Sequence, residues 1–433
     1  MTSPRAYAKK QAKTTQRRRL QLKRRLDKER QEAQRDLVAL HQALLDLGLA
    51  EHLVTEIEGR LRAQHKLLGK IFGLMFPTLF GCRHLHELTR VRGWDKNRPA
   101  EILGALPKRS WLKRLKRLGL DVLVALWRHT AAKSPATHSR WQWTWAVDDT
   151  VFRKYGRHFG LVGTWYSGQH KRVVPGIDGV LLVVVVGDGK LVVPVDFTIR
   201  RPDPKGPGGP CRDKLTWAKV MLDDRLAAFA RRGVQVSAPV LAADSWFSDS
   251  DFMIHMEVRH QGTLLVQGKS SYVFRLPDSR RVTGHDFLHE EAWPWRQSLH
   301  APGCRYARLR ARSRTFGAVT ILIVDAPHTD RFYLLCRATE RSATRLLRAW
   351  RRRHWIEQVF RTLKHLLATD ACQVRSEDAY YGHVVLRLMA GFVLFYTSRV
   401  IYKGRVTMEE IVGRVKHHWA TIEYEALDLY ALS

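Results

Sequence analysis

The change of hydrophobic period along residues 141–367 constrains the fold more than any other feature of this sequence. Apolar side chains alternate through Trp141–Thr150, which predicts a strand that ends in carboxylates. Two apolar runs, Val180–Val186 and Leu191–Phe197, flank a Gly-Asp-Gly turn and predict a hairpin. A basic loop is expected between the strand and the hairpin, with Lys154, Arg157 and Lys171.

Helical and strand patterns alternate after the hairpin. A helix is expected to begin after Asp213, a favourable N-cap residue, and to bury one apolar face. Val240–Ala243 then reads as a short buried strand. A second helix runs from about Ser248 to His260, and Thr263–Gln267 forms another strand. This alternation predicts an α/β fold.

The segment 270–340 has a different character. Its pattern is β-like and irregular, with candidate strands at Tyr306–Arg312 and Val319–Val324. A long helix follows over Thr344–Leu367, beginning near Ser342, and a further helical pattern covers Asp378–Tyr402. The order therefore predicts a β-rich insertion between two parts of one α/β core.

The helix around Trp350–Lys364 combines an apolar face with a charged stripe. The apolar face consists of Ile356, Val359, Phe360, Leu363 and Leu367. Trp350, Arg353, Glu357 and Lys364 stand at offsets 0, 3, 7 and 14, within about 60° of one another on the helical wheel. The same stripe is widened by Arg361, His354 and His365. One carboxylate therefore stands among cations and beside an aromatic ring.

Glu357 can be interpreted in two ways. It can pair with Arg353 at i−4 and with Arg361 at i+4 on a solvated helix face, as many glutamates do. Alternatively, it holds a metal ion while the surrounding cations hold phosphates. The full spacing is rare even in a chain rich in arginine, which favours the second interpretation if two aspartates stand upstream on strands.

The sequence supplies two such aspartates, Asp148 and Asp244, each at the expected end of a strand. Asp149 competes with Asp148, but alternation places Asp149 on the face of the large apolar residues and Asp148 on the lighter, more polar face. A bulge at the strand end would reverse this assignment. Asp244 could instead cap the next helix, a role that we assign to Asp249 and Asp251.

The charge of the chain indicates a polyanionic partner. In 433 residues, 74 Lys and Arg oppose 41 Asp and Glu, which gives a net charge of +33. Nucleic acid is the usual partner of such a protein, and no amphipathic anchor or lipidation signal favours a membrane. The apolar stretches are too short to span a bilayer or are interrupted by Arg387, so we expect a protein of the cytoplasm.

Cysteine and histidine usage argues against a zinc site. The five cysteines are scattered without a Cys-x2-Cys pair, which is typical of a reducing compartment. None of the twenty histidines forms a recognisable metal triad by its spacing. His354 and His365 are expected to face phosphates.

The N-terminal third is basic and helical. Residues 1–35 hold thirteen Lys and Arg against three acids, and they form either a solvated arm or an arm that contacts DNA. A helical pattern continues to Gly48, a favourable end for a helix. Residues 50–135 read as short helices broken by proline and glycine, as expected for a DNA-binding helical domain, in which no recognition helix can be assigned.

The helix spacing resembles the Tyr-x2-Arg-x3-Glu-x6-Lys signature of DDE transposases of bacterial insertion sequences, in the group-four branch. Trp350 stands where that family usually has Tyr, which keeps a stacking surface and loses a hydroxyl. The resemblance covers about residues 141–367. It is strongest at this helix, at Asp-Asp-Thr 148–150, which matches the Asp-x-Thr spacing of the family, and at Ala-Asp-Ser-Trp-Phe 243–247.

The resemblance implies an RNase H-like core interrupted by a β-rich insertion and preceded by a basic helical domain. The expected parts are a basic arm (1–35), a helical DNA-binding region (36–135), the first part of the core (136–269), the insertion (270–340), the second part of the core with the catalytic helix (341–402) and a C-terminal helix (403–433).

The resemblance also implies site roles. Asp148, Asp244 and Glu357 would be the catalytic residues and would hold Mg²⁺, or Mn²⁺ in its place. DNA would be bound by Trp350, Arg353, Arg361 and Lys364. Trp293 or Trp295 could stack on a displaced base, although core packing is the simpler expectation for both.

The expected function is cut-and-paste DNA transposition. The protein would bind the terminal inverted repeats of its own element, cleave there with Mg²⁺ and join the freed 3′-hydroxyl to target DNA, as a homodimer on double-stranded DNA. Two alternatives stay open: an RNase H-like nuclease without strand transfer, and an inactive DNA-binding derivative. In each case we expect a bacterial protein associated with the nucleoid.

Overall fold

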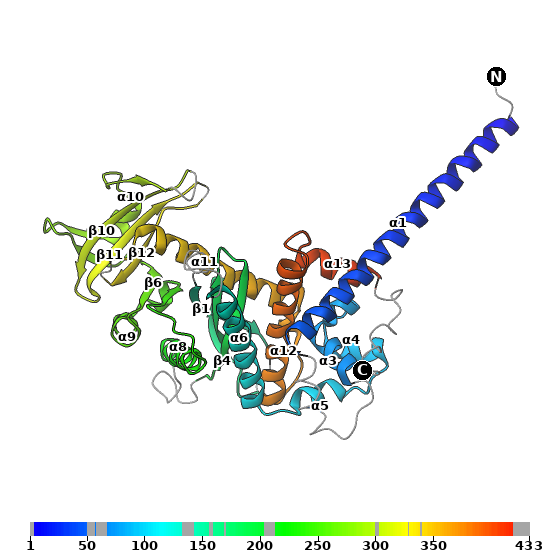
Figure 1. The fold of residues 1–433 in the computed structure, drawn as a ribbon, viewed down its shortest axis with the longest axis horizontal. Coiled ribbons are helices and arrows are strands. Elements are labelled where there is room, and N and C mark those ends of the chain that lie inside the picture. The colour runs from blue at the N-terminus through cyan, green and yellow to red at the C-terminus, as the bar shows by residue number, and fades with distance from the viewer. Residues whose placement is uncertain are drawn as a thin grey trace. The chain divides into compact units, whose positions relative to one another are not determined.

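The structure is a computed structural model with a mixed α/β architecture, a large mixed sheet and a long N-terminal helix (Figure 1). The residues that it describes are 4–49, 57, 67–131, 143–155, 159–168, 170–202, 213–298, 303–327, 329–337 and 340–418. Predicted features at Trp141, at Arg157, at 50–56 and 58–66, and beyond residue 418 lie outside these ranges.

The chain divides into two compact units. The first, which we call the helical unit, consists of Met1–Pro107, His365–Val374 and Asp378–Ser433. The second, the sheet unit, consists of Lys108–Lys364 and Arg375–Glu377. The three predicted catalytic carboxylates and the predicted DNA-binding residues Trp350–Lys364 belong to the sheet unit, whereas the basic arm, residues 36–107 and His365 belong to the helical unit.

The centre of the sheet unit is built from the strands that the sequence predicts. β1 (Trp143–Arg153), β3 (Arg172–Val186) and β4 (Leu191–Arg200) are antiparallel, and β5 (Val240–Ala243) and β6 (Thr263–Gln267) run parallel to β1. Their order across the sheet is β4-β3-β1-β5-β6. The hairpin between β3 and β4 is confirmed, and its turn needs glycine because two of its residues have positive φ.

Within the core, the strand at Gly163–Ser167 was not predicted. β2 (Gly163–Ser167) pairs with β3 in a segment that the sequence analysis assigns to a loop. β3 accordingly begins at Arg172, well before the apolar run at Val180. The reason is that backbone pairing along an edge extends the hairpin even where the side chains are not an alternating apolar series.

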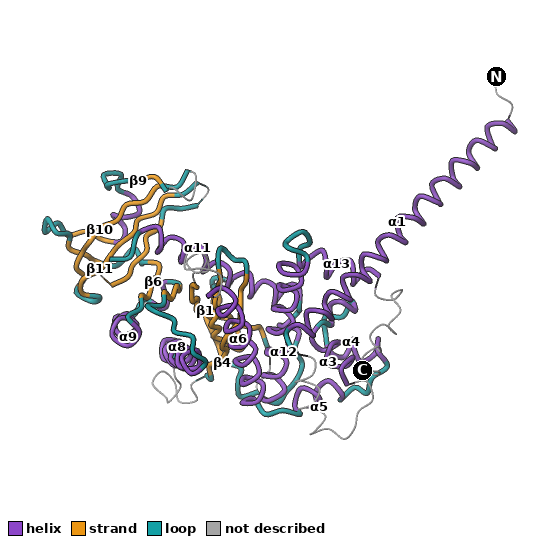
Figure 2. The backbone as a smooth tube through the Cα atoms, viewed as in Figure 1, coloured by secondary structure: helices purple, strands orange, loops and turns teal. Residues whose placement is uncertain are grey.

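The β-rich insertion continues the same sheet (Figure 2). β12 pairs with β6, with Leu335 opposite Val266, so that the insertion joins the core through backbone hydrogen bonds. The predicted strands at 306–312 and 319–324 lie within β10 and β11. The elements of this segment are β7 (Val273–Arg275), β8 (Arg281–Thr283), α10 (Gly284–His289), β9 (Arg296–Gln297), β10 (Arg305–Ser313), β11 (Gly317–Asp325) and β12 (Phe332–Arg337).

Among the described residues, four longer helices pack in the sheet unit, and one of them begins at the predicted cap Asp213. Asp213 caps α8 by accepting a hydrogen bond from the Thr216 backbone N–H at 2.7 Å. Ser342 caps α11 in the same way. The helices are α6 (Lys108–Ala131), α8 (Lys214–Arg231), α9 (Ser250–His260) and α11 (Ala343–Arg361), the last followed by a π-helical turn, Thr362–Leu366.

α8 and α11 cover opposite faces of β1. On one face, the rings of Trp143 and Trp145 lie 5.5 and 5.9 Å from that of Phe229 on α8. On the other, Arg352 of α11 reaches the hydroxyl of Thr144 at 3.4 Å. Strands covered on both faces bury every side chain, which explains the uninterrupted apolar run of β3.

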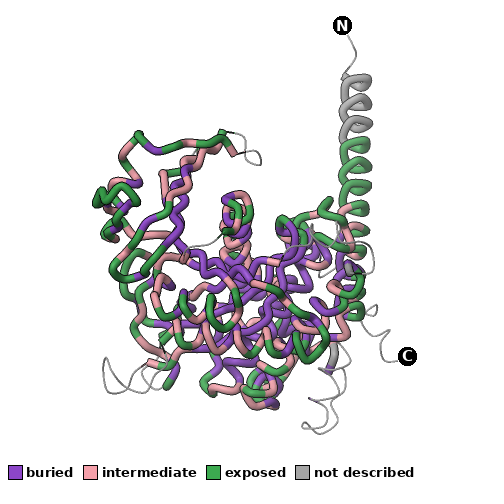
Figure 3. Tube along the Cα trace, turned by 60° about the vertical axis from the view of Figure 1, so that its left-hand side comes forward, coloured by how far each residue is buried: buried purple, intermediate pink, exposed green. Residues whose placement is uncertain are grey.

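The helical unit is organised by α1 (Pro4–Asp46), which ends before Gly48 as predicted. The basic arm is thus a continuation of this helix, and residues 16–28 are exposed (Figure 3). Deeper in the unit, buried Asp36 accepts hydrogen bonds from Tyr402 and Arg414, each at 2.7 Å. The other helices are α3 (Leu67–Met75), α4 (Leu85–Arg92), α5 (Arg98–Gly104), α12 (Glu377–Tyr396) and α13 (Met408–His418).

α12 with its π-helical extension, Glu377–Ile401, is long and apolar enough by composition to cross a membrane. However, 72% of its most apolar window is buried inside the protein. Arg387 in its middle is also buried and donates hydrogen bonds to the carbonyls of Leu74 and Met75. α12 is therefore packed as a core helix.

Candidate active site

Asp148 and Asp244 lie next to each other because of the register between β1 and β5. Ala146 and Ala242 are partners in this parallel pair, and each aspartate stands two residues further along its own strand direction. Since residues two apart share a face, both carboxylates leave the same side of the sheet. The prediction that β1 ends at the carboxylates is wrong: β1 continues to Arg153 in its pairing with β3, and only its described pairing with β5 stops at Ala146.

Asp244 lies close enough to Asp148 to affect the pKa of that carboxyl group. Burial raises the pKa of Asp148 to about 8, with the negative charge of Asp244 as the second cause and Arg353 opposing both. Burial likewise raises the pKa of Asp244, which Lys214 opposes. The site thus holds negative charge that its own cations do not fully compensate.

Arg353 connects Asp148 to Glu357. Its Nη1 donates to Asp148 Oδ2 at 3.2 Å, and its Nη2 forms an ion pair with Glu357 Oε1. His354 Nδ1 lies 3.1 Å from the other carboxylate oxygen of Glu357. The Arg353 guanidinium therefore joins α11 to β1 through a hydrogen bond between residues 205 positions apart.

Glu357 pairs with Arg353, as expected for a solvated helix face. The two side chains, however, are not equally exposed to solvent. Arg353 is largely buried, with 13% of its side chain exposed, whereas Glu357 is 43% exposed. The buried guanidinium spans two acids from different elements, which an ordinary i, i+4 pair does not do. The contact with Asp148 is what distinguishes this place from a surface ion pair.

Asp149 points to the other face of β1. Its Oδ1 accepts from Lys214 Nζ on α8 at 2.6 Å, and its charge raises the pKa of the neighbouring Asp178. β1 pairs with β3 without a register shift from Trp143 to Arg153, so no bulge reverses the alternation. The face assignment is therefore as predicted, while the role of Asp148 as a metal ligand stays a prediction.

Of the two residues predicted to cap the helix after Asp244, Asp249 is the cap and Asp251 lies in the first turn of α9. Asp249 Oδ1 accepts from the Phe252 N–H at 2.7 Å and caps α9, which confirms that prediction. Asp244 Oδ1 accepts from the Trp246 N–H at 2.9 Å and caps the short 3₁₀ turn Ser245–Phe247. The cap fixes the direction of the Asp244 carboxylate.

The donor set suits a hard divalent cation. Asp148, Asp244 and Glu357 come from three elements and offer carboxylate oxygens, the ligands that Mg²⁺ prefers. The raised pKa of Asp148 shows that added positive charge would be favourable there. Arg353 supplies part of that charge in this structure. The donor atoms are of the type that Mg²⁺ prefers, and binding of the ion by these residues stays a prediction.

The residues predicted to bind DNA have different surroundings. Trp350 is half-buried, with its ring 6.0 Å from that of Phe332 and 4.8 Å from the Arg353 guanidinium. Its stacking surface thus supports Arg353 within the protein. Arg361 is exposed on α11, and Lys364 is half-buried in the π-helical turn. Contact of these residues with DNA stays a prediction.

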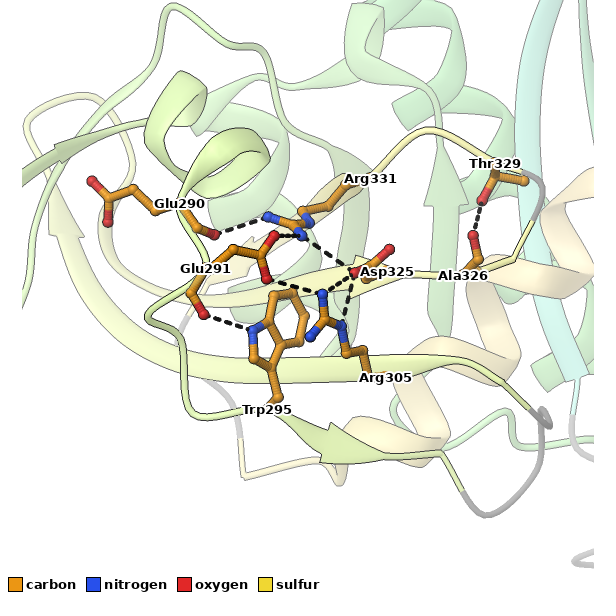
Figure 4. Close-up of polar contacts among 8 residues, drawn as sticks. All are labelled: Glu290, Glu291, Trp295, Arg305, Asp325, Ala326, Thr329 and Arg331. Atoms are coloured by element: carbon orange, nitrogen blue, oxygen red, sulfur yellow. Dashed lines mark hydrogen bonds and ion pairs between the residues drawn. The ribbon is translucent and has the colours of Figure 1, made fainter.

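Trp293 and Trp295 are both engaged inside the insertion. Trp293 is buried, with its ring 5.3 Å from that of Phe287, as core packing predicts. The ring of Trp295 lies 4.5 and 5.1 Å from the guanidiniums of Arg305 and Arg331, and its Nε1 donates to the Glu291 carbonyl (Figure 4). Both rings therefore have partners within the protein.

The sequence analysis missed Lys214 and Trp246. Lys214 forms an ion pair with Asp149 and lies 5.4 Å from the ring of Trp246. Its positive charge opposes the rise in the pKa of Asp244 that burial causes. Trp246 is 56% exposed, and Lys269 lies 5.0 Å from the same ring. Their positions in the sequence could have indicated that they lie near the site. Lys214 follows the cap Asp213, and Trp246 lies two residues after Asp244.

Comparisons with known proteins give a likeness in structure. No protein-family model matches the chain, and no curated protein matches it. Among solved structures, it is similar to a cryo-electron-microscopy structure of a piggyBac transposase synaptic complex with hairpin DNA. The TM-score is 0.43 at 11% sequence identity, covering 92% of this chain and 82% of the other.

Proposed function

We propose that this protein is a DDE-type DNA transposase with Asp148, Asp244 and Glu357 as its catalytic carboxylates. The observation that carries the proposal is the convergence of these acids from β1, the end of β5 and α11, with Arg353 bonded to two of them. Placing two acids together where burial raises the pKa of both, as for Asp148 and Asp244, is costly to a fold and is typical of functional sites.

The element order supports an RNase H-like core. Strand, hairpin, helix, strand, helix and strand follow one another and form the mixed order β4-β3-β1-β5-β6. The β-rich insertion separates Asp244 from Glu357 along the chain, as the resemblance to the transposase branch implies. The insertion extends the sheet of the core through β12.

The proposed reaction is phosphoryl transfer at the ends of the protein's own element. Mg²⁺ held by the three carboxylates would activate the attacking oxygen and stabilise charge on the leaving oxygen. Arg353 orients Asp148 and Glu357 through its contacts with both carboxylates. Its planar guanidinium would also bind a DNA phosphate. The ring of Trp350 lies 4.8 Å from that guanidinium.

DNA is the proposed partner because of charge and exposed side chains near the acids. The net charge is +33, and the exposed helix α1 is strongly basic over residues 16–28. Trp246, flanked by Lys214 and Lys269, offers an aromatic surface and cations two residues from Asp244. Transposon ends and target DNA would both bind, with a homodimer as the assembled form in the bacterial cytoplasm.

The proposal is tested with DNA fragments that flank the gene itself. Wild-type protein with Mg²⁺ is expected to cleave these fragments at defined ends and to join the 3′-hydroxyl to a second DNA, and chelation should stop both steps. Cleavage without joining would favour the nuclease alternative. Absence of both steps, with binding retained, would favour the inactive derivative.

A matched pair of variants localises the activity. Asp244→Asn and Asp249→Asn make the same substitution at two N-caps, and Asn caps about as well as Asp. We expect Asp244→Asn to lose cleavage and Asp249→Asn to retain it. Equal activity of the two variants would remove Asp244 from the catalytic site.

A further inference from the structure

We propose a second metal site, for Zn²⁺, formed by Asp223, His255 and His260. Asp223 lies on α8, while the two histidines lie on α9. The three side chains bring an oxygen and two imidazole nitrogens within 4.8 Å of one another. This ligand set differs from the proposed Mg²⁺ site, because imidazole suits zinc and related transition metals whereas Mg²⁺ prefers oxygen ligands.

The geometry is close to that of a bound ion. His255 Nε2 and His260 Nε2 lie 2.8 and 2.7 Å from the same oxygen, Asp223 Oδ1. Tetrahedral zinc with bonds of about 2.0–2.2 Å holds its ligand atoms about 3.4 Å apart. Small side-chain rotations that open each contact by about 0.6 Å would therefore admit the ion.

The two carboxylate oxygens of Asp223 have different partners. Its Oδ1 faces both imidazoles, whereas its Oδ2 lies 3.3 Å from Arg259 Nε. Arg259 is 64% exposed, so it can stay on Oδ2 while Oδ1 binds the ion. Partners of this kind orient ligands at known metal sites. The histidine side chains are only 22% and 12% exposed, which limits competition from solvent.

The sequence hides this site for two reasons. His255 and His260 are five residues apart, and neither i+3 nor i+4 spacing flags them as ligands on one helix face. His260 is the last residue of α9, where the helix ends at Gln261 in the left-handed conformation, and the two rings lie 5.4 Å apart. Asp223 comes from another helix. The expectation of no histidine metal site is therefore revised.

Bound zinc would fasten α8 to α9. Along this pair, Lys219 lies 3.7 Å from the α9 cap Asp249 as another link. α8 begins at Lys214, which bonds Asp149, and α9 follows the turn that Asp244 caps. The ion would thus stiffen the support of Asp244 without touching the reacting atoms. It is independent of the proposed transposase activity, because the binding itself requires no DNA.

The test measures zinc bound to the full chain after removal of metal. A chromophoric chelator competes for added Zn²⁺, and Co²⁺ absorption reports tetrahedral coordination. Wild type is expected to bind one more zinc per chain than the double variant His255→Gln/His260→Gln. The control variant His285→Gln/His289→Gln changes an exposed histidine pair with rings 4.2 Å apart and should bind as wild type does.

Asp223→Asn separates ligation from hydrogen bonding. The amide oxygen still accepts from both imidazoles, so the fold keeps its contacts, but a neutral oxygen is a poor zinc ligand. We expect this variant to lose the same zinc equivalent and the Co²⁺ spectrum while retaining wild-type circular dichroism. If wild type, Asp223→Asn and the double histidine variant all bind the same amount of zinc, the site does not exist and the contacts are hydrogen bonds only.

Discussion

Replacing Asp178 by asparagine should stabilise the protein at neutral pH. Asp178 lies on β3 with 1% of its side chain exposed and pairs with Arg200 Nη1 at 2.6 Å. Burial, followed by repulsion from Asp149, nevertheless raises the pKa of Asp178 to about 7. Its Oδ1 is buried and makes no hydrogen bond within the described residues. The ionised carboxylate therefore costs more than the ion pair with Arg200 returns.

The magnitude follows from the shift. A rise from 3.8 to about 7, at about 1.4 kcal/mol per pKa unit, sets an upper limit of about 4 kcal/mol. Arg200 retains the amide oxygen as an acceptor and is 22% exposed, so that part of the pair survives. We expect Asp178→Asn to gain about 2–4 kcal/mol at pH 8.

The raised pKa of Asp178 also determines how the stability of the protein changes with pH. The native state holds the Asp178 proton up to about pH 7, whereas the unfolded state loses it near the ordinary pKa of an aspartate, 3.8. Wild-type stability therefore falls as pH rises through this window, and Asp178→Asn lacks that loss. The difference between the two proteins should be small below about pH 4 and complete above about pH 7.

Urea unfolding followed by tryptophan fluorescence, at several pH values, measures this difference. Asp224→Asn on the exposed side of α8 serves as the control, with an expected change within about 0.5 kcal/mol. If Asp178→Asn is instead destabilised by about 3–5 kcal/mol, then the ion pair with Arg200 dominates and the reasoning is wrong.

Three further predictions concern the proposed reaction. Glu357→Gln should bind DNA and lose Mg²⁺-dependent cleavage, because it removes a ligand charge from a half-exposed side chain; near-normal cleavage would exclude Glu357 from the site. Lys364→Ala should weaken binding to end DNA and reduce the salt dependence by about one phosphate contact, as a salt titration would show. Asp148→Asn should abolish cleavage while Asp149→Asn leaves a reduced rate, and the reverse result in the same assay would reject the face assignment.

Local patterns in the sequence determined most elements of the core. Val240–Ala243 and Thr263–Gln267 were predicted with the bounds that the structure has, since each is a short apolar run between turn residues. The caps Asp213 and Asp249, and the start of the long helix near Ser342, were likewise readable, because a cap depends on contacts within three residues. Alternation along β1 also fixed which face each acid occupies.

Contacts between residues far apart in the sequence could not be predicted from local patterns. The bond between Arg353 and Asp148 joins residues 205 positions apart, and the bond between Lys214 and Asp149 joins residues 65 apart. The meeting of Asp223 with His255 and His260 depends on how α8 packs beside α9. Sequence spacing encodes neighbours along one helix or strand. Contacts between elements arise from packing and register, so only the tertiary structure decided which charges meet.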